Sequence, residues 1–131
     1  SREDISREYF FMDARDALGR RGEDEAAKYL KSIGYRIVGR REKILGGDID
    51  LVALDDRTVV FVEVRTRSNL RHGHPVETID RKKQIRISDL ANAFIQRHQL
   101  QDCSVRIDAV TVVFEDGMPA IEHYQNAFDS P

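Results

Sequence analysis

Two acidic residues, Asp50 and Glu63, lie on consecutive segments, 48–54 and 59–65, in which apolar and polar side chains alternate. Such alternation is typical of β-strands, and the polar residues 55–58 between the segments predict a hairpin. Whether the connecting loop has two residues or four, position 50 lies directly opposite position 63 on one face. We therefore expect the two carboxylates to be neighbours, with Cβ atoms roughly 4.5–5.5 Å apart.

Opposed carboxylates of this kind are suited to binding a divalent cation. Like charges placed directly opposite each other destabilise a hairpin unless something compensates them. Mg²⁺ is commonly held by one or two carboxylates, with its other positions left to water and substrate phosphate. Such an ion, or Mn²⁺ in its place, supports phosphodiester cleavage. Asp50 and Glu63 are therefore the predicted metal ligands.

An ordinary solvent-exposed hairpin explains the same residues. In that interpretation Asp48 and Arg65, which the same register places opposite each other, form a cross-strand ion pair of little energetic weight. Against it, Val52 and Phe61 fall on the face of the carboxylates, and charge beside an apolar surface is costly without a partner. The hairpin alone leaves both interpretations open.

The chain has a basic region although its net charge is −2. Between positions 65 and 86 lie seven basic residues and two acidic ones, a local net charge of +5. A basic face of this kind indicates binding to nucleic acid, although a basic helix face is often only solvated. The candidate nucleic-acid-binding residues are Arg67, Arg71, Lys82, Lys83 and Arg86. His72 and His74 could also contact phosphate or metal, but loop histidines are more often solvated.

Length and composition exclude several other classes of protein. At 131 residues the chain suits one domain with a real core. It has no apolar stretch near the roughly 20 residues of a membrane span and no secretory signal, so we expect a soluble, cytoplasmic protein without a membrane partner. The single cysteine, Cys103, cannot form an internal disulfide and is expected at the edge of the core. No P-loop, dinucleotide fingerprint or Ser/His/Asp order is present.

The elements that must position these residues follow from periodicity and turn signals. Residues 1–18 predict an N-terminal helical extension with an apolar stripe of Ile5, Tyr9 and Met12, which could pack on the domain, fray, or dock on a second copy as a homodimer. Residues 19–131 are then a single domain. We expect Gly19 to Gly22 to break the helix, and a second helix to bury Ala26, Ala27, Leu30 and Ile33. Short strand 35–38, the hairpin, a helix near 80–98 and strands 105–114 and 120–124 complete the chain. The order α, β, β, β, α, β, β predicts an α/β fold, a mixed sheet with helices on its faces.

Several ordered motifs resemble one bacterial family. They are Gly22-Glu23-x-x-Ala26, Gly47-Asp-Ile-Asp-Leu-Val52, Val60-Phe-Val-Glu-Val-Arg-x-Arg67, Gly73-x-Pro75, Lys83-Gln-x-Arg-Ile87 and Arg106-x-Asp108. Together, over roughly residues 19–124, they resemble the YraN-like family, whose members look like Holliday junction resolvases of the PD-(D/E)XK, restriction-endonuclease-like superfamily. The resemblance implies an α/β/α core and a metal-dependent endonuclease that acts on structured or branched DNA.

The resemblance also implies roles for individual residues. It makes Asp50 and Glu63 the metal ligands, for Mg²⁺ or Mn²⁺, and adds Glu23 as a third acidic residue, which by spacing alone is an ordinary carboxylate near a helix N-terminus. Arg65 stands where the nuclease motif has lysine. A guanidinium can bind the scissile phosphate but cannot readily act as a base. Lys43, Lys82 or Lys83 could supply the missing amine.

Three functions therefore compete. The first is a metal-dependent endonuclease with Glu23, Asp50, Glu63 and Arg65 as catalytic residues. The second is a nuclease-like module that binds nucleic acid without cutting it, because of Arg65. The third is an interaction protein that dimerises through its N-terminal stripe.

Overall fold

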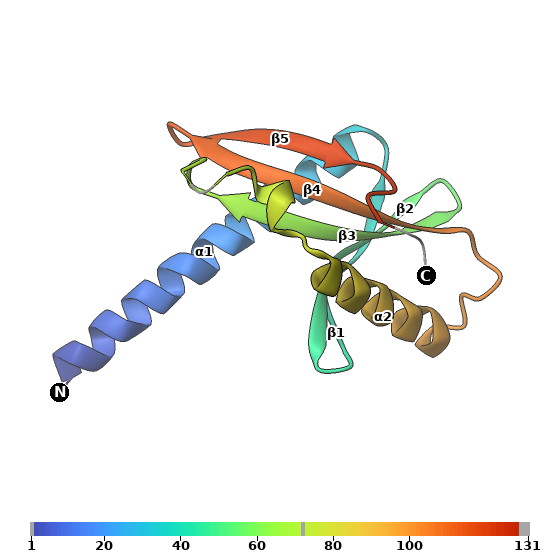
Figure 1. The fold of residues 1–131 in the computed structure, drawn as a ribbon, viewed down its shortest axis with the longest axis horizontal. Helices are drawn as coiled ribbons and strands as arrows, with labels where there is room; N and C mark the ends of the chain where they lie inside the picture. Colours follow the sequence, from blue (N-terminus) through green and yellow to red (C-terminus); the bar gives the residue numbers. More distant parts are fainter. Residues whose placement is uncertain (1, 72, 129–131) are drawn as a thin grey trace.

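Within the described residues, five strands form one mixed sheet in the order β1-β2-β3-β4-β5 (Figure 1). The computed structural model describes the backbone of residues 2–71 and 73–128 and the side chains of 14–71, 73–76 and 78–128. The strands are β1 (Arg36–Ile44), β2 (Gly47–Asp55), β3 (Thr58–Arg67), β4 (Val105–Glu115) and β5 (Met118–Tyr124). Neighbours pair antiparallel except β3 and β4, which run parallel. A parallel pair needs a crossover, and the 3-10 helix η1 (Pro75–Thr78) and helix α2 (Arg81–Arg97) lie within it.

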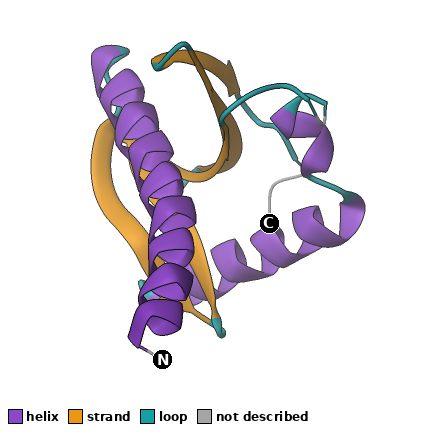
Figure 2. Ribbon diagram, turned by 90° about the vertical axis from the view of Figure 1, so that its left-hand side faces the viewer, coloured by secondary structure: helices purple, strands orange, loops and turns teal. Residues whose placement is uncertain are grey.

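One helix covers each face of the sheet, so the predicted α/β fold class is confirmed (Figure 2). Helix α1 (Arg2–Ser32) buries Ala26, Ala27 and Leu30 against one face. Helix α2 buries Ile87, Leu90, Ala91 and Ile95 against the other, together with Phe61 of β3. The two apolar clusters lie on opposite sides of β2 and β3, which explains why both strands are rich in β-branched residues.

Helix α1 is longer than the sequence predicts. The expected break from Gly19 to Gly22 is wrong, because α1 continues without interruption through both glycines. Gly22 serves close packing: a Cβ there would lie 1.9 Å from Oγ1 of Thr66 on β3. A glycine inside a helix costs about 1 kcal/mol relative to alanine, which burial of the adjoining apolar face offsets. The division of the chain at residue 18 stays a prediction.

Most other elements are confirmed, with three differences. Asp80 caps the N-terminus of α2, and β4 and β5 join through a turn at Asp116 and Gly117. Strand β1 extends to Ile44 because it pairs with β2 along most of its length. The prediction for Cys103 was wrong, since it is exposed in the loop before β4. Ile33, expected to be buried, is also exposed, because α1 ends at Ser32.

The N-terminal part of α1 extends beyond the edge of the sheet (Figure 1). The side chains of the predicted stripe, Ile5, Tyr9 and Met12, lie outside the described residues, so dimerisation stays a prediction. None of the helices in the described part of the chain is both long and apolar enough to cross a membrane.

Candidate active site

The candidate site lies where β2 and β3 separate. The predicted hairpin register is confirmed from Leu51 opposite Val62 to Asp55 opposite Thr58. Among the described residues, the backbone pairing of these strands ends at Leu51. The carboxylate of Asp50 occupies the next position, where its Oδ2 accepts a hydrogen bond from the backbone N–H of Val64 at 2.8 Å. The side chain of Asp50 thus replaces a backbone acceptor.

The alternation of β2 changes at the same place. Ile49 packs with Val52 in the cluster under α2, whereas Leu51 packs in the cluster under α1. Residues two apart would share a face in a regular strand, so the strand is irregular at Asp50. Arg41 of neighbouring β1 has a positive φ of 48°, which marks an irregularity beside it. The irregularity lets Asp50 interact with both Glu63 and Glu23 of α1.

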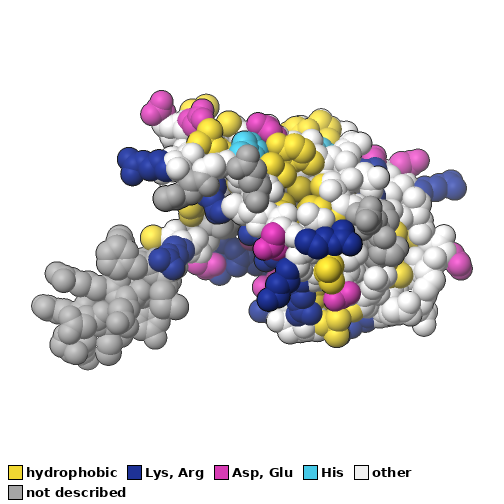
Figure 3. Space-filling model, in the orientation of Figure 1, with side chains coloured by type: hydrophobic (Ala, Val, Ile, Leu, Met, Phe, Trp, Pro, Cys, Tyr) yellow, Lys and Arg dark blue, Asp and Glu magenta, His cyan; other side chains and the backbone are white. Residues whose placement is uncertain are grey.

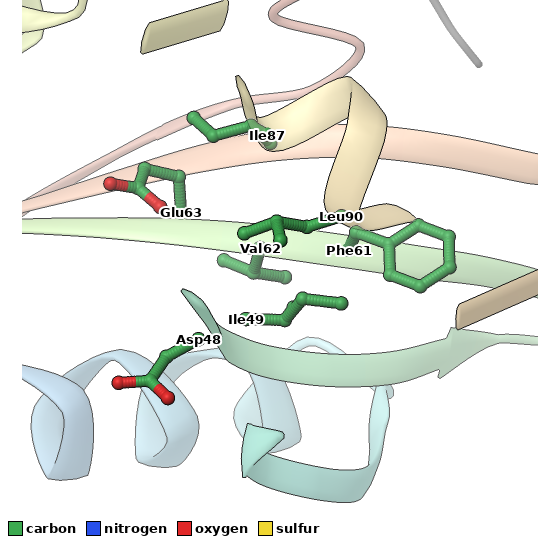
Figure 4. A pocket seen from close by; sticks show the side chains of 7 residues that line it. All are labelled: Asp48, Ile49, Phe61, Val62, Glu63, Ile87 and Leu90. Atoms are coloured by element: carbon green, nitrogen blue, oxygen red, sulfur yellow. The ribbon is translucent and has the colours of Figure 1, made fainter. Parts of the chain in front are cut away.

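Glu63 lies in a small, mainly apolar cavity between β3 and α2 (Figure 4). Its side chain is 11% exposed, and Ile49, Phe61 and Leu90 line the same cavity. The volume is about 10 Å³, which suits a water or an ion and excludes an organic ligand. In Figure 4 the carboxylates of Glu63 and Asp48 extend away from the apolar side chains toward the same end of the cavity.

Burial and mutual repulsion disfavour the ionised forms of both carboxyls. Burial, followed by the charge of Asp50, raises the pKa of Glu63 to about 8, although Arg65 and Lys83 act in the other direction. Burial also raises the pKa of Asp50, against the hydrogen bond from Val64. At neutral pH the pair therefore shares at least one proton. A cation that replaces this proton would relieve the repulsion.

Arg65 forms an ion pair with Glu63 and not with Asp48. Its Nε lies 3.4 Å from Oε1 of Glu63. The expected cross-strand pair between Asp48 and Arg65 is wrong, because Asp48 pairs with Lys43 of β1 in both backbone register and an ion pair of 3.7 Å. Past Leu51 the edge of β2 follows β1 and leaves β3. Within the described structure, the buried Nε of Arg65 has no hydrogen-bond partner.

Glu23 lies near the pair but is bound to an arginine. Its Oε1 accepts a hydrogen bond of 3.0 Å from Nε of Arg41, and its charge contributes to the raised pKa of Asp50. Across the described residues, no group of three His, Cys, Asp or Glu side chains is arranged to hold a metal ion. The donor set for a cation is thus two carboxylates, which is enough for Mg²⁺ when water and phosphate fill its other positions.

Lys43, Lys82 and Lys83, the lysines that could supply the missing amine, differ in their surroundings. The charge of Lys83, in the first turn of α2, opposes the rise in the pKa of Glu63. Lys43 is 86% exposed and engaged with Asp48. Lys82 is exposed. Of the three lysines, Lys83 is the one whose charge acts on Glu63.

The predicted nucleic-acid-binding residues form a discontinuous basic surface. Lys82, Lys83 and Arg86 are exposed on α2. In Figure 3, Lys and Arg side chains gather between α1 and the start of α2. Arg86 donates from Nη2 to the carbonyl of Leu45 at 2.5 Å, so it also holds the β1–β2 turn. Arg71 is exposed in the loop after β3, and Arg67 lies at the end of that strand.

Of the two loop histidines, the structure describes His74. His72 lies outside the described residues. His74 caps η1, since its Nδ1 accepts a hydrogen bond from the backbone N–H of Val76, and its Nε2 lies 3.4 Å from Glu122. His74 therefore has a structural role.

A buried polar network was not predicted as a structural feature. Asp108 is fully buried and accepts hydrogen bonds from Nε and Nη2 of Arg106 at 2.8 and 3.1 Å. His123 Nε2 lies 2.8 Å from Asp108. Burial pushes the pKa of Asp108 up, but the hydrogen bonds from His123 and Arg106 hold it below its usual value. The available signal was an Arg and an Asp two residues apart on a strand whose other residues are mostly apolar.

The chain is similar in sequence to members of one protein family. The family model of "Uncharacterised protein family UPF0102" matches residues 22–112, which include Glu23, Asp50, Glu63 and Arg65. A UPF0102 protein of Arthrobacter is 45% identical over 113 residues, which cover 86% of this chain and 96% of the relative. UPF0102 proteins of Trichlorobacter lovleyi and Geobacter sulfurreducens are each 44% identical, again over 86% of this chain and over 91% and 88% of the relatives.

Proposed function

This chain belongs to the uncharacterised protein family UPF0102, and we propose that it is a metal-dependent endonuclease that hydrolyses phosphodiester bonds in structured or branched DNA. The names of the relatives state no activity, so the proposal rests on the site. The observation that carries it is the pair Asp50 and Glu63, two partly buried carboxyls with raised pKa values, of which Glu63 lines a cavity the size of an ion. The motif resemblance to PD-(D/E)XK nucleases supports the same function.

Mg²⁺ or Mn²⁺ fits the pair on chemical grounds. Both ligands are hard oxygen donors, and the repulsion that burial imposes on them is relieved only by a proton or a cation. Oxygen atoms of Asp50 and Glu63 would hold the ion, and the hydrogen bond from Val64 fixes the orientation of Asp50. Once bound, the ion would stabilise negative charge on the phosphate that is cleaved.

The remaining residues of the site would position and neutralise the substrate. The guanidinium of Arg65 keeps its charge at every relevant pH, so it can donate hydrogen bonds to a phosphate but cannot accept a proton from water. Lys83 supplies a second positive charge within reach of Glu63. The pair must release its proton before both carboxyls can act as ligands.

A binding module that does not cleave is the second candidate function. Arg65 favours it, because this residue replaces the lysine of the nuclease motif and pairs with Glu63 at 3.4 Å. In that case the same surfaces bind DNA, and the carboxylates do not support hydrolysis.

A cleavage screen distinguishes the two candidates. The substrates are duplex, flap, single-stranded and four-way junction DNA, each tested with Mg²⁺, with Mn²⁺ and with EDTA. The endonuclease proposal expects cleavage that needs the metal and disappears in Asp50→Asn. Binding without cleavage of every substrate would favour the module, and cleavage that persists in Asp50→Asn would refute the assigned site.

A further inference from the structure

A groove of about 310 Å³ lies between α1 and β3, beside the carboxylate pair. Arg15 lines it from α1, and Arg65 and Arg67 line it from β3. The single carboxylate of its lining is Glu23. The groove is thus a concave, positively charged surface, which favours an anionic ligand.

The positive charge of the groove is incompletely neutralised. Glu23 is engaged through Oε1 with Nε of Arg41, which lines a separate pocket. Among the described residues, Arg65 pairs with Glu63, with Nε 3.4 Å from Oε1. Three arginines thus line the groove against one carboxylate, and that carboxylate is already engaged with Arg41.

The groove is continuous with the candidate active site. Arg65 belongs to its lining and lies 3.4 Å from Glu63. Glu23 also belongs to it and acts on Asp50. Gly22 packs against Thr66 so closely that α1 and β3 have a fixed separation. One turn earlier, a Cβ at Gly19 would meet nothing within 4 Å, so the groove is open there.

We propose that this groove binds a backbone phosphate of the substrate strand next to the bond that is cut, with Arg15 and Arg67 holding it from opposite walls. The inference rests on the proposed function for its substrate class and adds a subsite on the α1 side of the carboxylates. A nucleotide unit fits better than a free phosphate ion, because Leu18 and Val64 give the groove an apolar part that a sugar can cover.

Gly19 provides a variant that changes the groove without harming the fold. Its Cβ position is open, and any residue other than proline improves the helix propensity of α1. Gly19→Glu places a carboxylate in the groove, and Gly19→Gln places a neutral side chain of the same size there. Arg15→Gln removes one of the proposed ligands. Arg57→Gln removes the same charge at the exposed β2–β3 turn and serves as the matched control.

Affinity is measured by fluorescence anisotropy with a labelled single-stranded oligonucleotide and with its duplex, in EDTA. Gly19→Glu should weaken binding by roughly tenfold or more, and Arg15→Gln by roughly three- to tenfold with a salt slope flatter by about 0.7–0.9. Arg57→Gln should bind like the wild type. Weaker binding in Gly19→Gln also supports the proposal, because the neutral side chain then competes with the ligand for space in the groove.

Three results would overturn the inference. The first is wild-type affinity in Gly19→Glu. The second is an equal loss in Arg57→Gln and Arg15→Gln, which would mean a nonspecific effect of charge. The third is binding that requires a 5′-phosphate on the oligonucleotide, since the groove would then hold a strand end. Thermal melts confirm that each variant is folded.

The inference and the proposed function can fail separately, because binding in EDTA needs neither metal nor cleavage. A protein that never cleaves but loses affinity in Gly19→Glu retains the subsite and loses the endonuclease assignment. A protein that cleaves with Mg²⁺ but binds DNA normally in Gly19→Glu retains the assignment and loses the subsite.

Discussion

The carboxylate of Asp50 accepts a hydrogen bond from the backbone N–H of Val64 at the point where β2 and β3 separate. This hydrogen bond holds Asp50 beside Glu63, whose pKa burial and the charge of Asp50 raise to about 8. Ionising both carboxyls therefore costs free energy, which a cation or a substitution can relieve.

Asp50→Asn tests this relationship directly. The amide oxygen can still accept from Val64, while the charge that repels Glu63 is removed. We expect the metal-free variant to be as stable as the wild type or more stable by up to about 1 kcal/mol, and to lose stabilisation by Mg²⁺ or Mn²⁺. Thermal melts with and without metal measure both effects. Asp56→Asn, at the exposed β2–β3 turn, is the control. Equal metal stabilisation in wild type and Asp50→Asn would refute the metal site.

The raised pKa of Glu63 predicts a pH dependence of stability. Between about pH 4.5 and about pH 8 the unfolded chain ionises this residue while the folded, metal-free protein keeps it protonated. The unfolded state then binds fewer protons, so the contribution of Glu63 to the free energy of unfolding falls as pH rises through this window. Glu63→Gln should flatten the profile, as measured by urea denaturation at several pH values. A profile identical to that of the wild type would contradict the assignment.

Replacement of Arg65 separates enzyme from binding module. If the site cleaves, Arg65→Lys should keep or raise the rate, because it restores the amine of the nuclease motif. Arg65→Gln should lower single-turnover cleavage by roughly ten- to a thousandfold, because a charged donor to the phosphate is removed. In a binding module neither variant cleaves and both bind DNA less well. Wild-type cleavage that Arg65→Gln leaves unchanged would remove Arg65 from the active site.

The basic surface of α2 predicts a graded effect on DNA binding. Lys82→Gln and Lys83→Gln should each lower affinity and flatten the salt slope by about one unit for each phosphate that the variant no longer neutralises. Arg86→Gln should change the slope less, because the guanidinium already donates to the carbonyl of Leu45. Affinity across a salt series measures the slopes. Unchanged slopes in all three variants would place the DNA path elsewhere.

The network around Asp108 predicts a large effect on stability and none on chemistry. Asp108→Ala removes a fully buried carboxylate that Arg106 and His123 contact, although Arg106 keeps its ion pair with Asp55, and should cost about 2–4 kcal/mol. Because the pKa of Asp108 is lowered in the folded state, its stabilisation should be lost as pH falls through the acidic range. Urea denaturation at neutral and acidic pH measures both effects. A cost below about 1 kcal/mol would show that the network is not structural.

Local sequence information was enough to predict most of the elements. Alternation and turn residues gave the hairpin and its register from Leu51 to Asp55, because a period of two leaves little choice once one face is buried. Periodicity and the Asp80 cap likewise predicted α2. These features depend on residues close together in the chain, whereas the predicted pairing of Asp50 opposite Glu63 is not part of the register, which ends at Leu51.

What the sequence did not determine depends on interactions between distant residues. The local sequence around Gly22 predicts a break in the helix. Only the packing of Gly22 on Thr66, 44 positions along the chain, explains why α1 continues. The charges that surround the carboxylates also come from other elements: Arg41 on β1 binds Glu23, and Lys83 on α2 acts on Glu63. The groove beside the site exists because α1 lies against β3. No local pattern encodes these distances, since electrostatic interactions and close packing depend on positions in space.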